Sequence, residues 1–82
     1  MLEYFLMTQA SPIDITANLA RKIKALRKLH KWTAEELARK ANITPVYVSQ
    51  IENNKRKNIS LIVVYRIAQA FSVPVSVLID EL

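Results

Sequence analysis

The stretch that decides the fold is TAEELARKANITPVYVSQIENN, residues 33–54. It opens with the pattern of a capping box, because the Thr33 hydroxyl can accept from a free backbone N–H while Glu36 reaches back to the N–H of Thr33. Asn42 comes later, and asparagine tolerates the left-handed conformation in which many helices end. The stretch therefore predicts a helix that starts at Thr33, ends near Ala41 and is followed by a tight turn.

The second half of the stretch repeats these start signals. Thr44 is a capping residue, and Pro45 suits the first helical position, where its missing N–H has no partner to lose. Ile43 and Val48 have the spacing of a hydrophobic staple. A second short helix is therefore predicted over about 45–53. Two short helices joined by a turn of about three residues form a helix-turn-helix.

Amphipathic helices are expected on both sides of this pair. Apolar residues recur at spacings of three and four from residue 19 onward, with basic residues on another face, which predicts a helix over about 12–30. Ser60 can cap a helix that runs to about Phe71, and Ser76 a final turn and a half over residues 77–81. The predicted fold class is therefore all-α, a compact five-helix domain with a central helix-turn-helix.

The length and composition indicate one small packed domain. The chain has 82 residues, of which 51% are hydrophobic and 23% charged. Residues 1–11 are interpreted as an N-terminal extension, with Met7 as a second possible start, and residues 12–82 as the helix-turn-helix domain. A domain of this size buries little surface, so an oligomer is expected. No apolar stretch approaches the ~20 residues of a membrane helix, and a reducing cytoplasm is the default location.

Three residue counts exclude most catalytic chemistry. The sequence has no cysteine, no glycine and a single histidine, His30. Disulfides, Cys-ligated metals, thiol nucleophiles and glycine-rich phosphate loops are therefore excluded, and a histidine-rich metal site has too few ligands. The sequence predicts a protein that is not an enzyme and that has no catalytic residue, cofactor or metal.

Positive charge is concentrated in the middle of the chain. The net charge is +5, but all 12 lysines and arginines lie between Arg21 and Arg66, where only three carboxylates oppose them and leave +9. A basic face of this density is typical of proteins that bind nucleic acid, since each cation placed on a phosphate releases a counterion. The alternative is a solvated helix face with no partner.

The second helix of the pair carries the residues best suited to read DNA. The major groove admits one α-helix and shows a distinct pattern at each base pair. Gln50 can make paired hydrogen bonds with adenine, while Thr44 and Ser49 can donate or accept. Pro45 and Val46 can contact only thymine methyl groups. These five residues are the predicted base readers, and they favour a half-site rich in A·T pairs.

The same stretch resembles the lambda-repressor and Cro type of helix-turn-helix, the XRE family. The resemblance continues through Asn58-Ile-Ser-Leu and Ile67-Ala-Gln-Ala-Phe-Ser-Val, and covers roughly residues 19–80. It implies a five-helix domain that binds an inverted-repeat operator in double-stranded DNA as a homodimer, with the helix over 45–53 as recognition helix. The implied contacts to the DNA backbone are Thr33, Tyr47, Asn53, Lys55, Arg56, Lys57, Asn58 and Ser60.

Further features follow from the resemblance. It implies a structural ion pair between Arg27 and Glu52 that supports the recognition helix. Family members usually carry a glutamine that clamps the recognition glutamine and a phosphate, and this chain has Ala34 there, so one clamp is expected to be missing. The family also favours glycine at several helix ends, where a left-handed backbone is expected. The residues at those ends are Lys31, Asn42, Asn54 and Ser72.

Several apolar residues near the C-terminus are predicted to meet a second copy of the chain. Family helices tend to be polar where this chain has Ile62 and Val63, and exposed branched residues suggest a partner surface. For some of the apolar residues near the C-terminus, Ile79 in particular, the alternative is that the side chain packs in the core. Tyr65 is expected in the core, with Trp32 and Phe71. The predicted dimer interface is Ile62, Val63, Val75, Val77 and Ile79.

The sequence thus predicts a homodimeric, sequence-specific transcription regulator. Lys57-Asn-Ile-Ser-Leu and Val46-Tyr-Val-Ser are similar to the controller proteins of restriction-modification systems, a subclass of small regulators. An alternative of another class is an antitoxin or other interaction module. Such a module would hold a partner protein through the apolar N-terminal segment or the surface around Ile62 and Val63.

Overall fold

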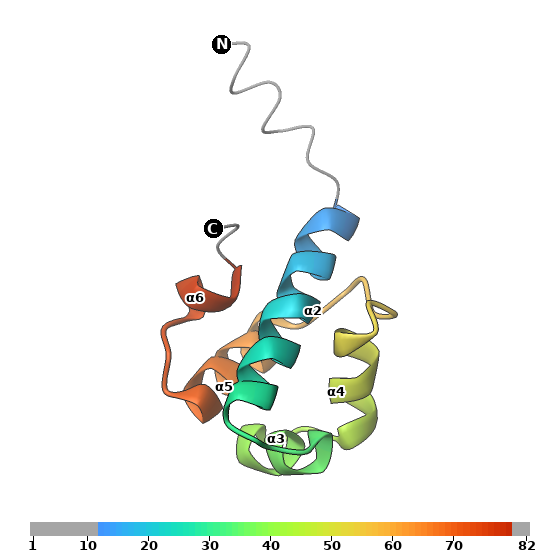
Figure 1. The fold of residues 1–82 in the computed structure, drawn as a ribbon. Coiled ribbons are helices and arrows are strands. Elements are labelled where there is room, and N and C mark those ends of the chain that lie inside the picture. Colours follow the sequence, from blue (N-terminus) through green and yellow to red (C-terminus); the bar gives the residue numbers. More distant parts are fainter. Residues whose placement is uncertain (1–11, 80–82) are drawn as a thin grey trace.

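The computed structural model describes residues 12–79, and within them the chain forms helices and connecting turns only. The all-α prediction is therefore correct, and the helices over 12–30, 33–41, 45–53 and 60–71 each agree with an observed helix to within a residue or so. The expected N-terminal extension lies outside the described residues. In chain order the helices are α2 (Pro12–Leu29), α3 (Ala34–Ala41), α4 (Pro45–Glu52), α5 (Leu61–Phe71) and α6 (Val75–Ile79) (Figure 1).

Side-chain caps define where the central helices begin. The Thr33 hydroxyl accepts from the backbone N–H of Glu36 at 3.1 Å, and the Thr33 N–H donates to Glu36 Oε1 at 3.0 Å. The Thr44 hydroxyl accepts from the N–H of Tyr47 at 3.1 Å, and Ser60 caps α5. These bonds satisfy N–H groups that have no partner inside the helix. The capping box and the other two predicted caps are thus confirmed.

Four turns are made by residues in the left-handed conformation, although none of these residues is glycine. Asn42 and Ser72 end α3 and α5 in this way, and their N–H groups bond back to carbonyls of the last helical turn. A side chain in this conformation costs about 1–2 kcal/mol relative to glycine, less for asparagine. The four predicted positions are Lys31 (φ 59°), Asn42 (57°), Asn54 (55°) and Ser72 (57°).

The last helix begins earlier than the sequence predicts. Ser76 was expected to cap it, but α6 starts at Val75, so Ser76 lies inside the helix. The physical reason is Pro74, whose fixed φ is already close to helical. Its carbonyl accepts from the N–H of Val77 at 3.0 Å, which closes the first turn. The expected end of this helix, within residues 80–82, lies outside the described residues.

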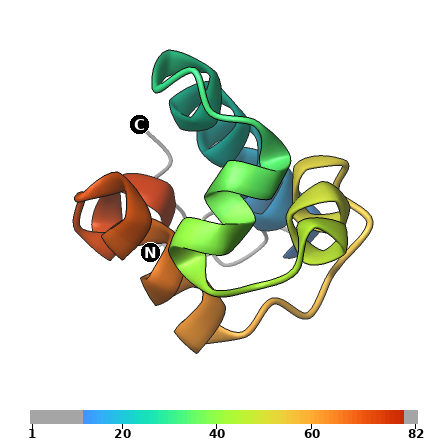
Figure 2. The same ribbon diagram turned by 90° about the horizontal axis from the view of Figure 1, so that it is seen from below.

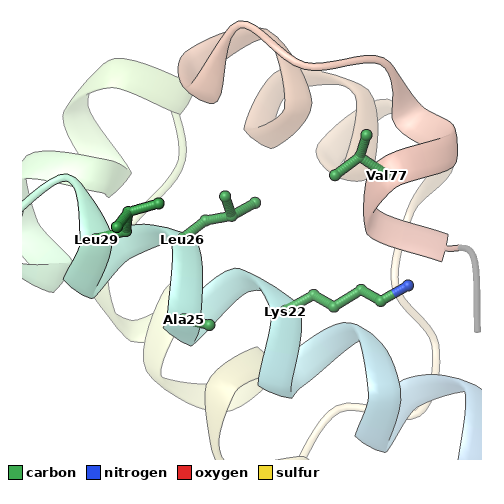
Figure 3. Close-up of a pocket in the computed structure, with 5 residues that line it drawn as sticks. All are labelled: Lys22, Ala25, Leu26, Leu29 and Val77. Carbon is green, nitrogen blue, oxygen red and sulfur yellow. The ribbon is translucent and has the colours of Figure 1, made fainter. Parts of the chain in front are cut away.

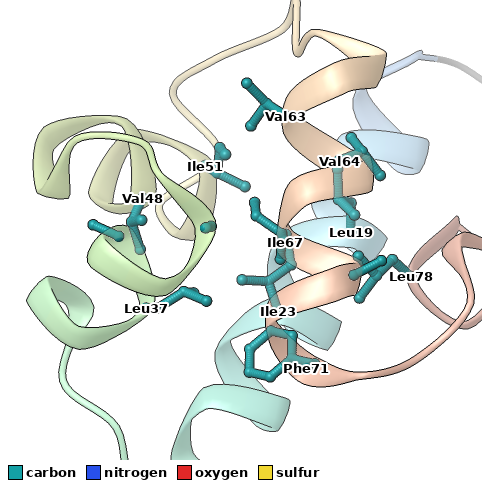
Figure 4. Close-up of a cluster of buried hydrophobic side chains, with 13 residues drawn as sticks. Leu19, Ile23, Leu37, Val48, Ile51, Val63, Val64, Ile67, Phe71 and Leu78 are labelled. Atoms are coloured by element: carbon teal, nitrogen blue, oxygen red, sulfur yellow. The ribbon is translucent and has the colours of Figure 1, made fainter.

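The core forms where all five helices meet (Figure 4). On α5 the residues Val63, Ile67 and Phe71 recur every four positions and point inward. The prediction that Val63 belongs to an exposed interface is therefore wrong, because this spacing places its side chain in the core at 8% exposure. The buried cluster comprises Leu19, Ile23, Leu37, Ala38, Ala41, Val48, Ile51, Val63, Val64, Ile67, Ala68, Phe71 and Leu78.

A stack of aromatic rings closes the end of the core beside α3. The rings of Trp32 and Phe71 are nearly parallel with centroids 5.3 Å apart, and His30 stacks on Trp32 at 4.6 Å. Phe71 is buried and Trp32 packs against the core, as predicted. Tyr65 was expected there too, but it lies on the outer face of α5 and is 52% exposed.

The packing of the helices leaves one side of α4 open. α4 contacts α2 and α3, whereas α6 contacts α2 and α5. In both views α4 and α6 therefore lie on opposite sides of the bundle (Figures 1 and 2). Residues 53–60 connect α4 to α5 without forming a helix. The outer surface of α4 and this connecting loop are consequently free to meet a partner.

Candidate nucleic-acid interface

Helix α4, the predicted recognition helix, has one buried and one exposed side. Val48 and Ile51 are fixed in the core at 1% exposure each. This anchoring turns the predicted base readers outward, and Val46 is 65% exposed. Gln50 is the exception, since it is half-buried. Thr44, Pro45, Val46 and Ser49 are all exposed.

The two hydroxyl groups on this surface are set up to donate. The Thr44 hydroxyl accepts from a backbone N–H, and the Ser49 hydroxyl accepts from Asn53 Nδ2 at 3.2 Å. A hydroxyl that accepts in this way keeps its own proton for a second partner. The exposed face of α4 therefore offers O–H donors beside the apolar surface of Pro45 and Val46. Base edges that match such a face carry acceptors or a methyl group, as thymine does.

An ion pair between helices holds the far end of α4. Arg27 Nε and Nη2 donate to the two oxygens of Glu52 at 2.7 and 2.9 Å, and Nη1 donates to the carbonyl of Trp32 at 2.9 Å. The hydrogen bond to Glu52 raises the pKa of Arg27 above its ordinary value, although burial acts in the opposite direction. The pairing implied by the resemblance is present, and it joins α2 to the C-terminal end of α4.

Glu36, which closes the capping box of α3, also titrates differently from a free glutamate. Its carboxylate accepts from the backbone N–H of Thr33. This hydrogen bond is the main reason that the pKa of Glu36 lies below its ordinary value. Thr33, a predicted phosphate contact, is thus held at the exposed start of α3 by a charged partner.

Five of the eight predicted backbone contacts gather in one surface depression of about 490 Å³. Ser60 caps α5 beside it, and its N–H donates to the Tyr47 hydroxyl at 3.4 Å. Lys57 Nζ donates to the Asn54 carbonyl at 3.0 Å and is exposed. Cations next to a helix start suit a phosphate group. The residues lining the depression are Tyr47, Arg56, Lys57, Asn58, Ile59 and Ser60.

The other three predicted backbone contacts lie outside this depression. Asn53 ends α4 and Lys55 follows in the loop, and both are exposed. Thr33 stands apart from them, at the start of α3. The predicted contacts thus form one main group around the loop and a separate position on α3.

The structure also shows a contact that the sequence did not predict. Arg56 Nε donates to Gln50 Oε1 at 3.0 Å, and the guanidinium lies 4.1 Å from the ring centre of Tyr47. Ala34 has no polar side chain that could bond Gln50, and the bond to Gln50 Oε1 comes from Arg56 of the loop. No helical spacing connects residues 50 and 56, so periodicity could not find this pair.

Exposed apolar side chains are also present on α5 and α6, where they line separate depressions. Ile62 is 62% exposed, and Val77 and Ile79 are exposed as well, in agreement with a surface position, while Val75 is half-buried. Sequence reasoning missed Leu61, whose side chain is exposed beside Ile62. The signal that could have indicated its exposure was its position directly after Ser60, the cap of α5. Leu61, Ile62, Tyr65 and Val75 line one apolar depression.

A further apolar pocket of about 450 Å³ opens between α2 and α6. Leu26 and Leu29 extend from α2 toward Val77 of α6 (Figure 3). Leu29 is exposed and was not predicted as a surface residue. The pocket extends the apolar surface of α6 onto α2. It is lined by Lys22, Ala25, Leu26, Leu29 and Val77.

Within residues 12–79 no three His, Cys, Asp or Glu side chains are grouped so that they could hold a metal ion. None of the helices in this range is long and apolar enough to cross a membrane.

Known proteins with similar sequences include a repressor and a transcriptional regulator. The chain is 38% identical over 63 residues to the immunity repressor protein of Bacillus phage phi105. It is 33% identical over 63 residues to the HTH-type transcriptional regulator SinR of Bacillus subtilis (strain 168). Each alignment covers 77% of this chain but only 43% and 57% of the relative, so the chain spans about half the length of these two proteins.

Two solved structures have the same fold. The restriction-modification controller protein C.AhdI from Aeromonas hydrophila superimposes with a TM-score of 0.73 and 24% identity, over 77% of this chain and 94% of that one. The hypothetical transcription factor NHTF from Neisseria superimposes with a TM-score of 0.77 and 31% identity, over 85% of this chain and 79% of that one. The likeness to C.AhdI concerns the fold.

A family model supports the same assignment across most of the helices. It describes the helix-turn-helix family HTH_3 and matches residues 23–78, from the middle of α2 to α6. Membership and the named relatives agree with a protein that binds rather than catalyses. The α3–α4 pair lies inside this match, and the chain belongs to the helix-turn-helix family.

Proposed function

We propose that the chain is a sequence-specific regulator of transcription that binds double-stranded DNA through α4. The observation that carries the proposal is the exposed face of α4, anchored from behind by Val48 and Ile51 and flanked by the cationic loop 53–60. A repressor and a transcriptional regulator among the relatives support it. In this arrangement α4 enters the major groove, while α3 crosses the DNA backbone.

The loop and the helix starts supply the contacts that hold the DNA backbone. Arg56 and Lys57 neutralise phosphates in the depression beside Ser60, and Lys55 adds a third cation. Thr33 meets the backbone from the start of α3. These contacts position α4 without reading sequence, and they make affinity fall as salt rises. Sequence is read by the hydroxyls of Thr44 and Ser49, by Gln50 and by the apolar groups of Pro45 and Val46.

The proposed functional unit is a homodimer on an inverted repeat. Leu61 and Ile62 on α5, and Val77 and Ile79 on α6, are exposed apolar side chains that a second copy can cover. Because α6 and α4 lie on opposite sides of the bundle, pairing through α5 and α6 leaves both recognition helices free. The two helices then meet successive major grooves, about 34 Å apart.

Selection from random duplex DNA at ~150 mM salt, followed by sequencing, tests the proposal, because specific binding persists where simple phosphate attraction is weak. The expected result is an inverted repeat whose half-sites are about ten base pairs apart and rich in A·T pairs. A selection that enriches no sequence would contradict the proposal. Co-purification of a stoichiometric second protein would instead favour the interaction-module interpretation.

Two serine variants provide a matched control for that selection. Ser49→Asp places a negative charge on the exposed face of α4, and it is expected to abolish enrichment because the carboxylate repels phosphates. Ser72→Asp makes the same change at an exposed position in the turn after α5, outside the exposed face of α4 and outside the proposed dimer residues, and aspartate tolerates the left-handed conformation there. It is expected to enrich the same sequence as the unmodified protein. Equal loss in both variants would contradict a reading role for α4.

A further inference from the structure

We propose that Arg56 is a positioning residue that orients the amide of Gln50 before DNA is bound, so that a loop residue sets a base preference of the recognition helix. The inference rests on the proposed function, since it concerns how that site reads DNA. Its basis is the hydrogen bond of 3.0 Å from Arg56 Nε to Gln50 Oε1.

The chemistry of the two side chains fixes which end of the amide faces the loop. A guanidinium has five N–H donors and no acceptor. Only the oxygen of the Gln50 amide can therefore face Arg56, and the nitrogen must point elsewhere. With Oε1 engaged, Gln50 offers DNA both N–H groups of Nε2 and one remaining lone pair of Oε1. This order of donor and acceptor matches adenine, which presents N7 to a donor and N6–H to an acceptor.

Arg56 is itself held in place, which a positioning residue requires. Its guanidinium lies over the ring of Tyr47, 4.1 Å from the ring centre. The hydroxyl of Tyr47 in turn accepts from the N–H of Ser60 at 3.4 Å. The contacts thus run from Gln50 through Arg56 and Tyr47 to the start of α5. An arginine stacked on an aromatic ring has fewer orientations to lose when it forms a hydrogen bond.

The neighbouring lysines differ from Arg56 in all these respects. Arg56 and Gln50 are half-buried, whereas Lys55 and Lys57 are exposed. No bond from either lysine to a base-reading side chain is present among the described residues. Lys57 therefore serves as the matched control. It has the same charge in the same loop and lines the same depression, but its ammonium group is hydrogen-bonded to the Asn54 carbonyl and not to Gln50.

The test compares Arg56→Ala, Arg56→Lys, Lys57→Ala and Gln50→Ala with the unmodified protein. Each is titrated with the selected half-site and with every single-base substitution of it, at several salt concentrations. Gln50→Ala identifies the base pair that Gln50 reads, with a loss of discrimination on the order of ten-fold. Arg56→Ala is expected to lose discrimination at that same base pair, and the double variant Gln50→Ala/Arg56→Ala to lose no more.

Arg56→Lys separates charge from orientation. It keeps the cation but loses the planar group that stacks on Tyr47 and donates from Nε. It is expected to keep the salt dependence of the unmodified protein and still to lose discrimination at the base pair read by Gln50. Lys57→Ala is expected to weaken all sequences alike. The inference is overturned if Arg56→Ala also weakens all sequences alike, with discrimination intact.

A measurement without DNA keeps this inference apart from the proposed function. The side-chain amide resonances of Gln50 in the free protein, assigned by NMR, are expected to shift in Arg56→Ala and to stay in place in Lys57→Ala. Unchanged resonances in both variants would overturn the orienting role even if DNA binding is found. If the unmodified protein selects no sequence while the resonances shift, the proposed function fails and the contact stands.

Discussion

The carboxylate of Glu52, at the end of α4, is held by two hydrogen bonds from Arg27 of α2, 2.7 Å from Nε to Oε2 and 2.9 Å from Nη2 to Oε1. The side chain of Arg27 is only 16% exposed, and that of Glu52 only 7%. Because Arg27 also bonds the carbonyl of Trp32, one guanidinium joins α2, the turn before α3 and α4. The angle at which α4 is presented therefore depends on a residue 25 positions earlier.

Removing either partner of this pair is expected to be costly. Glu52→Ala should lower the free energy of unfolding by on the order of 3 kcal/mol, because it leaves a largely buried charge unpaired. Arg27→Ala should cost at least as much, since the Trp32 carbonyl also loses its donor. Urea denaturation measures both. The double variant should cost clearly less than the two single effects added together, and simple additivity would contradict the coupling.

The capping box of α3 predicts a pH effect. The pKa of Glu36 is lower in the folded chain than its ordinary value, so its carboxylate contributes stability above the unfolded pKa of about 4.3 and loses it as pH falls through the folded pKa. The melting temperatures of the unmodified protein and Glu36→Ala should therefore differ most near pH 6 and converge toward pH 3. Glu35→Ala, which removes a carboxylate from the same turn but not the cap, should show less convergence.

The left-handed turn at Ser72 predicts a stabilising substitution. Ser72→Gly removes the side chain that disfavours this conformation and should raise the free energy of unfolding by about 1 kcal/mol. For a domain of this size that corresponds to roughly 4–8 °C in melting temperature. Arg66→Gly, at an exposed position inside α5, should lower it by about 1 kcal/mol. A Ser72→Gly protein that melts at a lower temperature would contradict this account.

The apolar surface of α5 predicts how self-association can be broken. Ile62→Glu should yield folded monomers, because Ile62 is 62% exposed and a charge there is tolerated only outside an interface. Sedimentation at micromolar concentrations, with circular dichroism on the same samples, measures both properties. Val63→Glu changes the next residue, which is buried, and should instead unfold the chain. An unmodified protein that stays monomeric would contradict the proposed dimer.

Local signals allowed most of the fold to be predicted. Thr33, Thr44 and Ser60 cap helices as expected because an N-cap depends on residues within one turn. The start of α6 was missed because Pro74 and Ser76 both signal a helix start, and the proline prevailed.

Which side of a helix is buried was harder to predict than where the helix begins. α5 is apolar at nearly every position, so composition did not separate Val63, which is buried, from Ile62 and Tyr65, which are exposed. The four-residue spacing of Val63, Ile67 and Phe71 was the pattern that indicated the buried side of α5. In the candidate site, the outward positions on α4 followed from its period, whereas the bond from Arg56 to Gln50 depends on a loop path that no periodic pattern encodes.

The four left-handed turns made without glycine have a consequence for how this protein can change. Lys31, Asn42, Asn54 and Ser72 each stand where glycine would relieve strain, and none is among the predicted base readers. A variant that acquires new specificity through destabilising changes on α4 can therefore regain its stability at these four turns, one substitution at a time. The fold thus combines an exposed face of α4 that is open to divergence with four turn positions that can compensate for the lost stability.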